Sequence, residues 1–251
     1  WVLDGASVSY GFAFELKDAL SHDIQRERDF KYTGMDMSEI VKHIAQFTSD
    51  IWQIHPFCEG NTRTTAVFII KYLRSLGFDV NNTTFEKKSW YFRNALVRAN
   101  YQNLQKGIYK ETIHLERFFR NLLMGEDNVL MNRHLHIKAK ELLDGTTPTS
   151  TPTSTPTSTP TSTPTSTPIS LFPESENIKR IISAIAEKQL SVKEMMAAVG
   201  LKDRPNFIEY SLSPAMREGY VRMLYPDSPR HPRQKYLLTV KGLAAYKELS
   251  R

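Results

Sequence analysis

The chain has 251 residues, of which 40% are hydrophobic and 24% are charged, and its formal net charge is +6. This length and composition allow a buried core and predict two folded units. The single cysteine, Cys58, excludes an internal disulfide and a thiolate metal cluster, which fits a reducing compartment, the cytoplasm. The longest purely apolar run, residues 66–70, is too short to span a bilayer.

The first predicted element is a small β-hairpin at the start of the chain. Apolar and other side chains alternate over residues 2–10 around the pair Asp4-Gly5, which is typical of a tight hairpin turn. The alternating positions are Val2, Ala6, Val8 and Tyr10. Because the chain begins at Trp1 and not at methionine, we expect it to be a fragment or a processed form, so that any signal peptide cannot be observed.

Two helices separated by a short polar loop come next. Asp36 and Glu39 have the spacing of a reciprocal N-terminal cap, and apolar residues follow at helical spacing: Ile40, Ile44, Phe47, Ile51 and Ile54. The second helix, over 64–76, ends at Gly77. Its surface is apolar nearly all round, which predicts a place in the middle of a bundle. Further helices are expected over 85–100, 110–123 and 130–143.

A repetitive segment divides the chain. Residues 147–166 repeat the tetrapeptide TPTS five times, and TPIS follows. Proline at every fourth position prevents helix and sheet ladders, so we expect an extended spacer; a glycosylated stalk is the alternative. The predicted organisation is a catalytic domain over 1–143, a linker over 144–172 and a second domain over 173–251. All the net charge lies in the last part, because residues 176–251 hold 14 Lys+Arg and 8 Asp+Glu.

The loop between the two helices, HPFCEGNTRT at residues 55–64, gathers groups suited to phosphate chemistry. The start of the second helix leaves backbone N–H groups free, and Gly60 lets a ligand approach them. Asn61 and Arg63 could donate to phosphate oxygens, and Glu59 could share a magnesium ion with them. A neutral His55 could take a proton from an incoming hydroxyl.

The same loop closely resembles the Fic domain signature, H-P-F-x-[DE]-G-N-x-R, which is found in enzymes that transfer AMP from ATP to protein hydroxyls. The resemblance implies a mainly α fold: a helical bundle with a β-hairpin flap. It also implies a role for each motif residue. His55 would be the base, Glu59 would hold Mg²⁺ on the α- and β-phosphates, Gly60 and Asn61 would line an anion hole, and Arg63 would grip the terminal phosphates.

Other segments resemble the family outside the signature. Phe57 looks like the motif's buried anchor, and YFRNALVRAN resembles the adenosine-side helix, which implies nucleoside contacts from Asn100, Tyr91 and Phe92. The front hairpin, residues 2–10, resembles the flap that pairs with the target protein as an added strand. Since the flap lies so near the start of the chain, the resemblance also implies that the domain is truncated at its N-terminus.

Two positions depart from the family pattern. Ala66 stands where many members have a second arginine, which weakens the expected clamp on the γ-phosphate. Thr62 stands where relatives that act as kinases have lysine, and this favours nucleotide transfer. The resemblance therefore implies magnesium-dependent adenylylation of a Ser, Thr or Tyr hydroxyl, with self-modification as a side activity. UMP transfer, phosphorylation, removal of AMP, and a nucleotide-sensing DNA-binding regulator are the alternatives.

The basic C-terminal part resembles the winged-helix units of many Fic proteins. A helix over 177–188 precedes a helix-turn-helix pattern that turns at Gly200, and strands are expected over 221–225 and 235–239. This small α+β unit would contact DNA through five predicted residues and also His231 on the wing. The five are Lys202, Arg204, Asn206, Arg230 and Arg233. Docking to a protein or to a second copy of the chain is the alternative.

Overall fold

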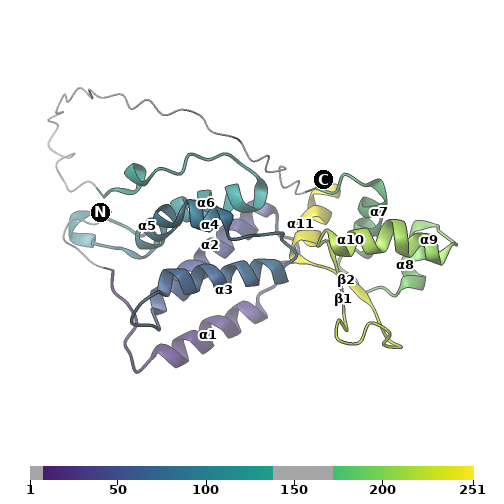
Figure 1. Ribbon diagram of the computed structural model, residues 1–251, viewed down its shortest axis with the longest axis horizontal. Coiled ribbons are helices and arrows are strands. Elements are labelled where there is room, and N and C mark those ends of the chain that lie inside the picture. Colours follow the sequence, from purple (N-terminus) through teal and green to yellow (C-terminus); the bar gives the residue numbers. More distant parts are fainter. Residues whose placement is uncertain (1–7, 138–171) are drawn as a thin grey trace.

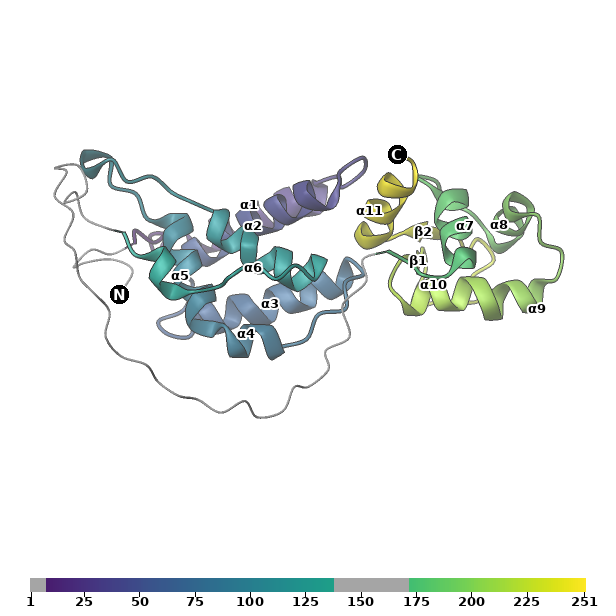
Figure 2. The ribbon, with the colours of Figure 1, turned by 90° about the horizontal axis from the view of Figure 1, so that it is seen from above.

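The computed structural model describes residues 8–137 and 172–251, which form two helical units in contact with each other (Figures 1 and 2). We call them the N-terminal unit (8–137) and the C-terminal unit (172–251). The helices of the N-terminal unit are α1 (Leu16–Asp29), α2 (Met37–Ile54), α3 (Asn61–Ser75), α4 (Thr83–Lys87), α5 (Ser89–Asn100) and α6 (Ile113–Met124), with 3-10 turns η1 (Leu104–Lys106) and η2 (Asn132–Leu135). The mainly helical fold class is confirmed.

The central helix of the N-terminal unit is α2, which contacts α1, α3, α5 and α6. The predicted cap is present: the Glu39 N–H donates to the Asp36 carboxylate at 3.0 Å, and the Asp36 N–H donates to the Glu39 carboxylate at 2.8 Å. The prediction that the following helix lies in the middle of the bundle was wrong. In α3, Ile69 and Leu73 are buried against the core, whereas Val67 on the other side is 53% exposed.

Several predicted boundaries change. The helix expected over 85–100 is divided at Lys88 into α4 and α5, and in the described part of the segment 130–143 only η2 is regular. Helix α1 was not predicted, although Leu16, Ala19, Leu20 and Ile24 lie at helical spacing and pack, partly buried, against the core. Residues 8–12 form no strand, and the rest of the predicted hairpin, like most of the linker, lies outside the described residues. The predicted domain boundaries therefore remain predictions.

The C-terminal unit contains α7 (Glu176–Ile185), α8 (Val192–Val199), α9 (Arg204–Phe207), the π turn η4 (Ile208–Leu212), α10 (Ser213–Arg217), β1 (Val221–Met223), β2 (Tyr236–Leu238) and α11 (Val240–Leu249). The two predicted strands are confirmed as an antiparallel pair with Val221 opposite Leu238. The predicted end of α8 at Gly200 is also confirmed, since this residue caps the helix with φ 73°. The successive elements α9, η4 and α10 form one helical stretch over 204–217.

The two units meet where α3 ends and α11 begins (Figure 2). The Lys241 N–H donates to the Leu76 carbonyl at 3.1 Å, and Val240 belongs to the hydrophobic core of the N-terminal unit. Gly77 and Gly219 face each other so closely that a Cβ on either would lie 2.1–2.2 Å from the other's carbonyl oxygen. The C-terminal unit therefore contacts the end of α3 that is opposite the polar loop.

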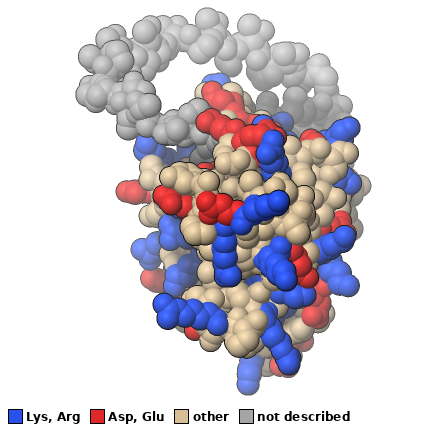
Figure 3. Space-filling view, turned by 90° about the vertical axis from the view of Figure 1, so that its right-hand side faces the viewer, with Lys and Arg blue, Asp and Glu red and all other residues tan. Residues whose placement is uncertain are grey.

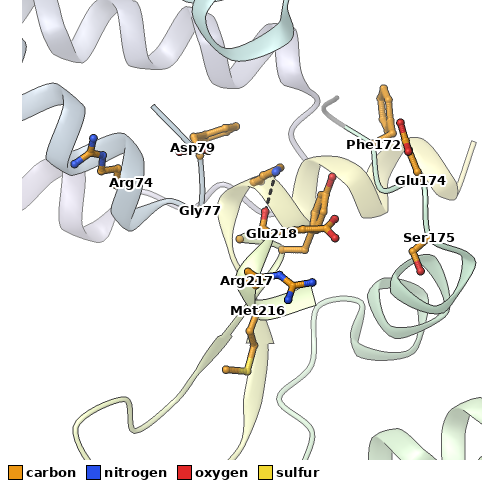
Figure 4. A pocket seen from close by; sticks show the side chains of 13 residues that line it. Arg74, Gly77, Asp79, Phe172, Glu174, Ser175, Met216, Arg217 and Glu218 are labelled. Atoms are coloured by element: carbon orange, nitrogen blue, oxygen red, sulfur yellow. Dashed lines mark hydrogen bonds between the residues drawn. The ribbon is translucent and has the colours of Figure 1, made fainter. Parts of the chain in front are cut away.

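A hollow of about 920 Å³ opens beside this junction. Figure 4 shows it lined on one side by Arg74 and Asp79 of the N-terminal unit and on the other by Arg217 and Glu218 of the C-terminal unit. Lys241 is buried at its edge, where the ammonium donates to the Glu218 carbonyl at 2.8 Å. In residues 8–137 and 172–251 no helix combines the length and the apolar character needed to cross a membrane.

Candidate active site

The polar loop joins α2 to α3 through two residues in the left-handed conformation. His55 ends α2 with φ 55° and ψ 55°, and Gly60 precedes α3 with φ 77° and ψ 8°. Glycine takes this conformation freely, whereas a non-glycine residue takes it rarely and at a cost in free energy. Such strain is concentrated at functional sites. The loop therefore fixes the direction of the His55 side chain at the end of a long buried helix.

Asn61 supports the loop from inside. The Phe57 N–H donates to its side-chain oxygen at 3.0 Å, and its side-chain amide donates to the Phe57 carbonyl. The amide thus stabilises the loop through one of its N–H groups, and its predicted contact with phosphate remains a prediction. Phe57 itself is 51% exposed, so the prediction of a buried anchor was wrong. Trp52 also stabilises the loop, because its indole N–H donates to the Thr62 hydroxyl at 3.0 Å.

The first turn of α3 faces this loop with no side-chain cap, so its N–H groups are open to an anion. Arg63 is exposed and folds back over Gly60, because a Cβ built there would lie 3.7 Å from the Arg63 Nη2 atom. The side chain has no ion-pair partner in the part of the chain that the structure describes. The α3 start and the Arg63 guanidinium thus offer positive charge on the same side of the loop.

Glu59 is exposed in the same loop. In the described ranges no group of three or more His, Cys, Asp or Glu side chains could hold a metal by itself. One accessible carboxylate nevertheless suits Mg²⁺, which commonly binds one or two carboxylates and takes its other ligands from water and substrate phosphates. The chemistry of this donor fits a magnesium ion that arrives with a nucleotide.

Two aromatic rings surround the His55 imidazole. Tyr10 lies against one side with ring centroids 3.8 Å apart and an interplanar angle of 31°, and Trp52 meets the ring edge-on at 5.6 Å. Tyr10 is held there by its neighbours: the Gly11 N–H donates to the Gln53 carbonyl, and the Gln53 side chain donates to the Ser9 carbonyl at 3.2 Å. The end of the predicted flap thus covers the proposed base.

Burial lowers the pKa of His55 below its ordinary value of 6.5, and the positive charge of Arg93 lowers it further. The nearby Trp52 carbonyl opposes this shift, although it makes no hydrogen bond of good geometry with the buried Nδ1 atom. The imidazole is therefore neutral at neutral pH. A neutral imidazole is the form that can accept a proton.

The lowered pKa of His55 predicts how the transfer rate of Tyr10 variants depends on pH. In Tyr10→Ala the imidazole becomes hydrated, so the pKa of His55 should rise toward its ordinary value and the neutral form should be lost at a higher pH. The ratio of the transfer rate at about pH 6 to that at about pH 8 should therefore fall relative to the wild type. A rate profile against pH measures it. Tyr10→Phe keeps the ring and should keep the wild-type ratio; an unchanged profile in Tyr10→Ala would contradict the account.

The predicted nucleoside contacts lie in the core. Tyr91 and Phe92 are 2% and 1% exposed, and Asn100 is buried. The Tyr91 hydroxyl donates to the His114 carbonyl at 3.2 Å, and the Asn100 amide donates to the Leu96 carbonyl at 3.0 Å. The structure therefore places all three side chains inside the core, and the predicted nucleoside contacts remain predictions. Tyr91 and Phe92 pack against α6, whereas the Asn100 amide also donates to the Ser49 carbonyl of α2 at 3.3 Å.

Another part of the α5 surface is at least partly exposed. Trp90, Arg93 and Asn94 line a hollow of about 200 Å³ together with Asn132 and His136. The positive charge of Arg93 acts to lower the pKa of both His55 and Tyr10. Arg93 forms no ion pair within residues 8–137 and 172–251, and its face of the helix could have been found from the 3.6-residue period of 89–100. Arg93, Tyr10 and Trp52 are the neighbours of the base that sequence reasoning missed.

The predicted DNA contacts lie far along the chain, on the surface of the C-terminal unit. Lys202, Arg204 and Asn206 are exposed around the turn into α9, and Arg230 and Arg233 are exposed in the loop between β1 and β2. The structure brings Arg204 and Arg230 to one groove. Lys202, Asn206 and Arg233 do not line it.

Both units match models of known protein families. Residues 9–73 match the model of the Fic/DOC family, and residues 176–239 match that of the filamentation induced by cAMP protein Fic-like, C-terminal domain. A crystal structure of a Fic family protein from Desulfovibrio desulfuricans G20 is similar over 95% of this chain and 60% of that one, with 18% identity and a TM-score of 0.33. The chain thus spans 60% of the length of that protein. A search of curated proteins gave no match.

Proposed function

Because this chain is a Fic domain protein, we propose that it transfers AMP from ATP to a Ser, Thr or Tyr hydroxyl of a target protein. Family membership supports a Fic-type transfer in general, and the choice of AMP is our proposal. The observation that carries it is His55, a neutral and partly covered imidazole held at the end of α2 beside an open helix start. Its loop contains every specified residue of the transfer motif.

The proposed reaction is an in-line displacement at the α-phosphorus. A ring nitrogen of His55 accepts the proton of the target hydroxyl as the oxygen forms a bond to phosphorus. The bond from phosphorus to the bridging oxygen breaks, and pyrophosphate leaves with the electron pair. The N–H groups at the start of α3 and the Arg63 guanidinium stabilise the negative charge on the phosphates. Glu59 would hold Mg²⁺, which when bound neutralises phosphate charge.

The environment of Thr62 supports nucleotide transfer over phosphorylation. Its hydroxyl accepts a hydrogen bond from Trp52, and this bond stabilises the loop. No cation stands at this position, so the open positive groups are those of Arg63 and the helix start. The target would approach along residues 8–12, because this segment covers His55 and must move aside for a hydroxyl to reach the ring. The same approach permits self-modification by a hydroxyl of the chain.

ATP labelled on different phosphates tests the proposal. The purified chain and a cell lysate are incubated with Mg²⁺ and ATP that carries the label on either the α- or the γ-phosphate. We expect protein-bound label from α-labelled ATP alone, and excess unlabelled UTP should compete poorly. Label from γ-labelled ATP would show phosphorylation, efficient competition by UTP would show UMP transfer, and the absence of label from both would contradict a transferase. Each of these results overturns the choice of AMP.

A further inference from the structure

A basic groove lies in the C-terminal unit between the start of α8 and the loop that joins β1 to β2. It has a volume of about 430 Å³, and its charged lining consists of Lys193, Arg204, Arg230 and the titratable His231. None of the described residues that line it is Asp or Glu. These cations come from three separate segments of the chain, so folding is required to bring them together.

The loop that supplies Arg230 is held in one shape. The Gln234 side chain accepts from the Tyr225 N–H at 3.0 Å and donates to the Tyr225 carbonyl at 2.8 Å. The His231 ring lies against the Tyr225 ring with centroids 4.1 Å apart and an interplanar angle of 37°, and the backbone N–H of His231 donates to the Ser228 carbonyl. A loop ordered in this way presents its charges at a smaller entropic cost on binding.

Three acidic side chains, Glu194, Asp203 and Asp227, lie within two sequence positions of groove residues but do not line the groove. Glu194 accepts from the Ser191 N–H at 2.7 Å in a capping box, and Asp203 accepts from the Asn206 N–H at 3.2 Å as the cap of α9. In the described ranges none of the ion pairs includes Lys193, Arg204 or Arg230. Like charges that share a groove repel one another, and a bound polyanion would relieve this repulsion.

We propose that this groove binds the phosphate backbone of double-stranded DNA. A duplex carries one negative charge per about 1.7 Å of its axis, so adjacent phosphates can engage cations on α8, on α9 and on the loop at the same time. Exposed Lys202 and Arg233 extend the positive surface beyond the groove. Figure 3 looks onto this end of the molecule, where Lys and Arg side chains predominate over its lower half. The proposal does not depend on the transfer reaction.

The chemistry favours backbone contacts over base recognition. The groove is lined by cations and by Pro229 and Pro232, and it offers phosphate-binding groups without a row of amide side chains for base edges. Binding should therefore be weakly dependent on sequence and strongly dependent on salt.

Fluorescence anisotropy of a short labelled duplex of mixed sequence, titrated with the full chain at several salt concentrations, tests the proposal. Arg204→Gln/Arg230→Gln should weaken binding at least about tenfold at low salt and reduce the slope of log K against log salt by about two, because each phosphate contact contributes about 0.9. The matched control, Arg180→Gln/Lys188→Gln, removes the same charge from exposed positions on and just after α7 and should retain the wild-type slope.

Three results would overturn the proposal. The first is the absence of salt-dependent binding by the wild-type chain. The second is an equal loss in the groove variant and in the α7 control, which would indicate a general charge effect. The third is tighter binding of poly-glutamate than of the duplex at the same salt, because the groove would then suit an acidic protein segment. Circular dichroism of both double variants establishes that each is folded.

Discussion

Replacing Gly219 by alanine is expected to lower the free energy of unfolding by roughly 2–6 kcal/mol. Two costs add. The residue has φ 80°, where a side chain is strained, and the new Cβ would lie 2.1 Å from the Gly77 carbonyl oxygen across the junction of the two units. The bond from the Lys241 N–H to the Leu76 carbonyl, one residue before Gly77, also holds the two units together. Denaturant unfolding monitored by circular dichroism measures the change.

Gly200→Ala provides the matched control. This glycine has φ 73° in the same unit, and a Cβ there would meet nothing within 4 Å. Its replacement should therefore cost only the conformational strain, about 1–2 kcal/mol. If the two substitutions destabilise the protein equally, the close approach of Gly77 and Gly219 does not contribute to stability, and the contact between the units is weaker than described.

Replacing His55 by alanine should reduce the rate of transfer by about 10²–10⁴-fold, which is the usual contribution of a general base. The methyl group cannot accept the hydroxyl proton, whereas the phosphate-binding groups of α3 and Arg63 remain in place. ATP binding, measured by isothermal titration calorimetry, should therefore change little. His22→Ala, at a histidine whose side chain is 73% exposed on α1, is the control and should keep the wild-type rate. A rate unchanged by the loss of His55 would remove it from the mechanism.

The local parts of the fold could be predicted from the sequence. Asp36 and Glu39 specify their cap through bonds between residues three apart, and Gly200 specifies the end of α8 through its own backbone conformation. In the same way, the order of residues 55–64 was enough to identify the candidate site. Each of these signals lies within a few consecutive residues, so it does not depend on tertiary packing.

Contacts that depend on how the helices pack could not be predicted from the sequence in this way. Tyr91 faces inward against α6 and Asn100 faces inward against α2, and the sequence of α5 alone does not say which neighbours it has. Tyr10 reaches His55 across 45 positions, and this contact controls the exposure of the imidazole. α11 was missed because its apolar residues are divided between two cores: Val240 packs in the first and Ala245 in the second.

The most direct test of the central claim is the intact mass of the purified chain after incubation with Mg²⁺ and ATP, measured beside His55→Ala treated in the same way. We expect the wild-type chain to gain the mass of one or more AMP groups and the variant to gain none. An adduct of equal amount on both proteins, or an adduct with the mass of a phosphoryl group, would contradict AMP transfer by His55.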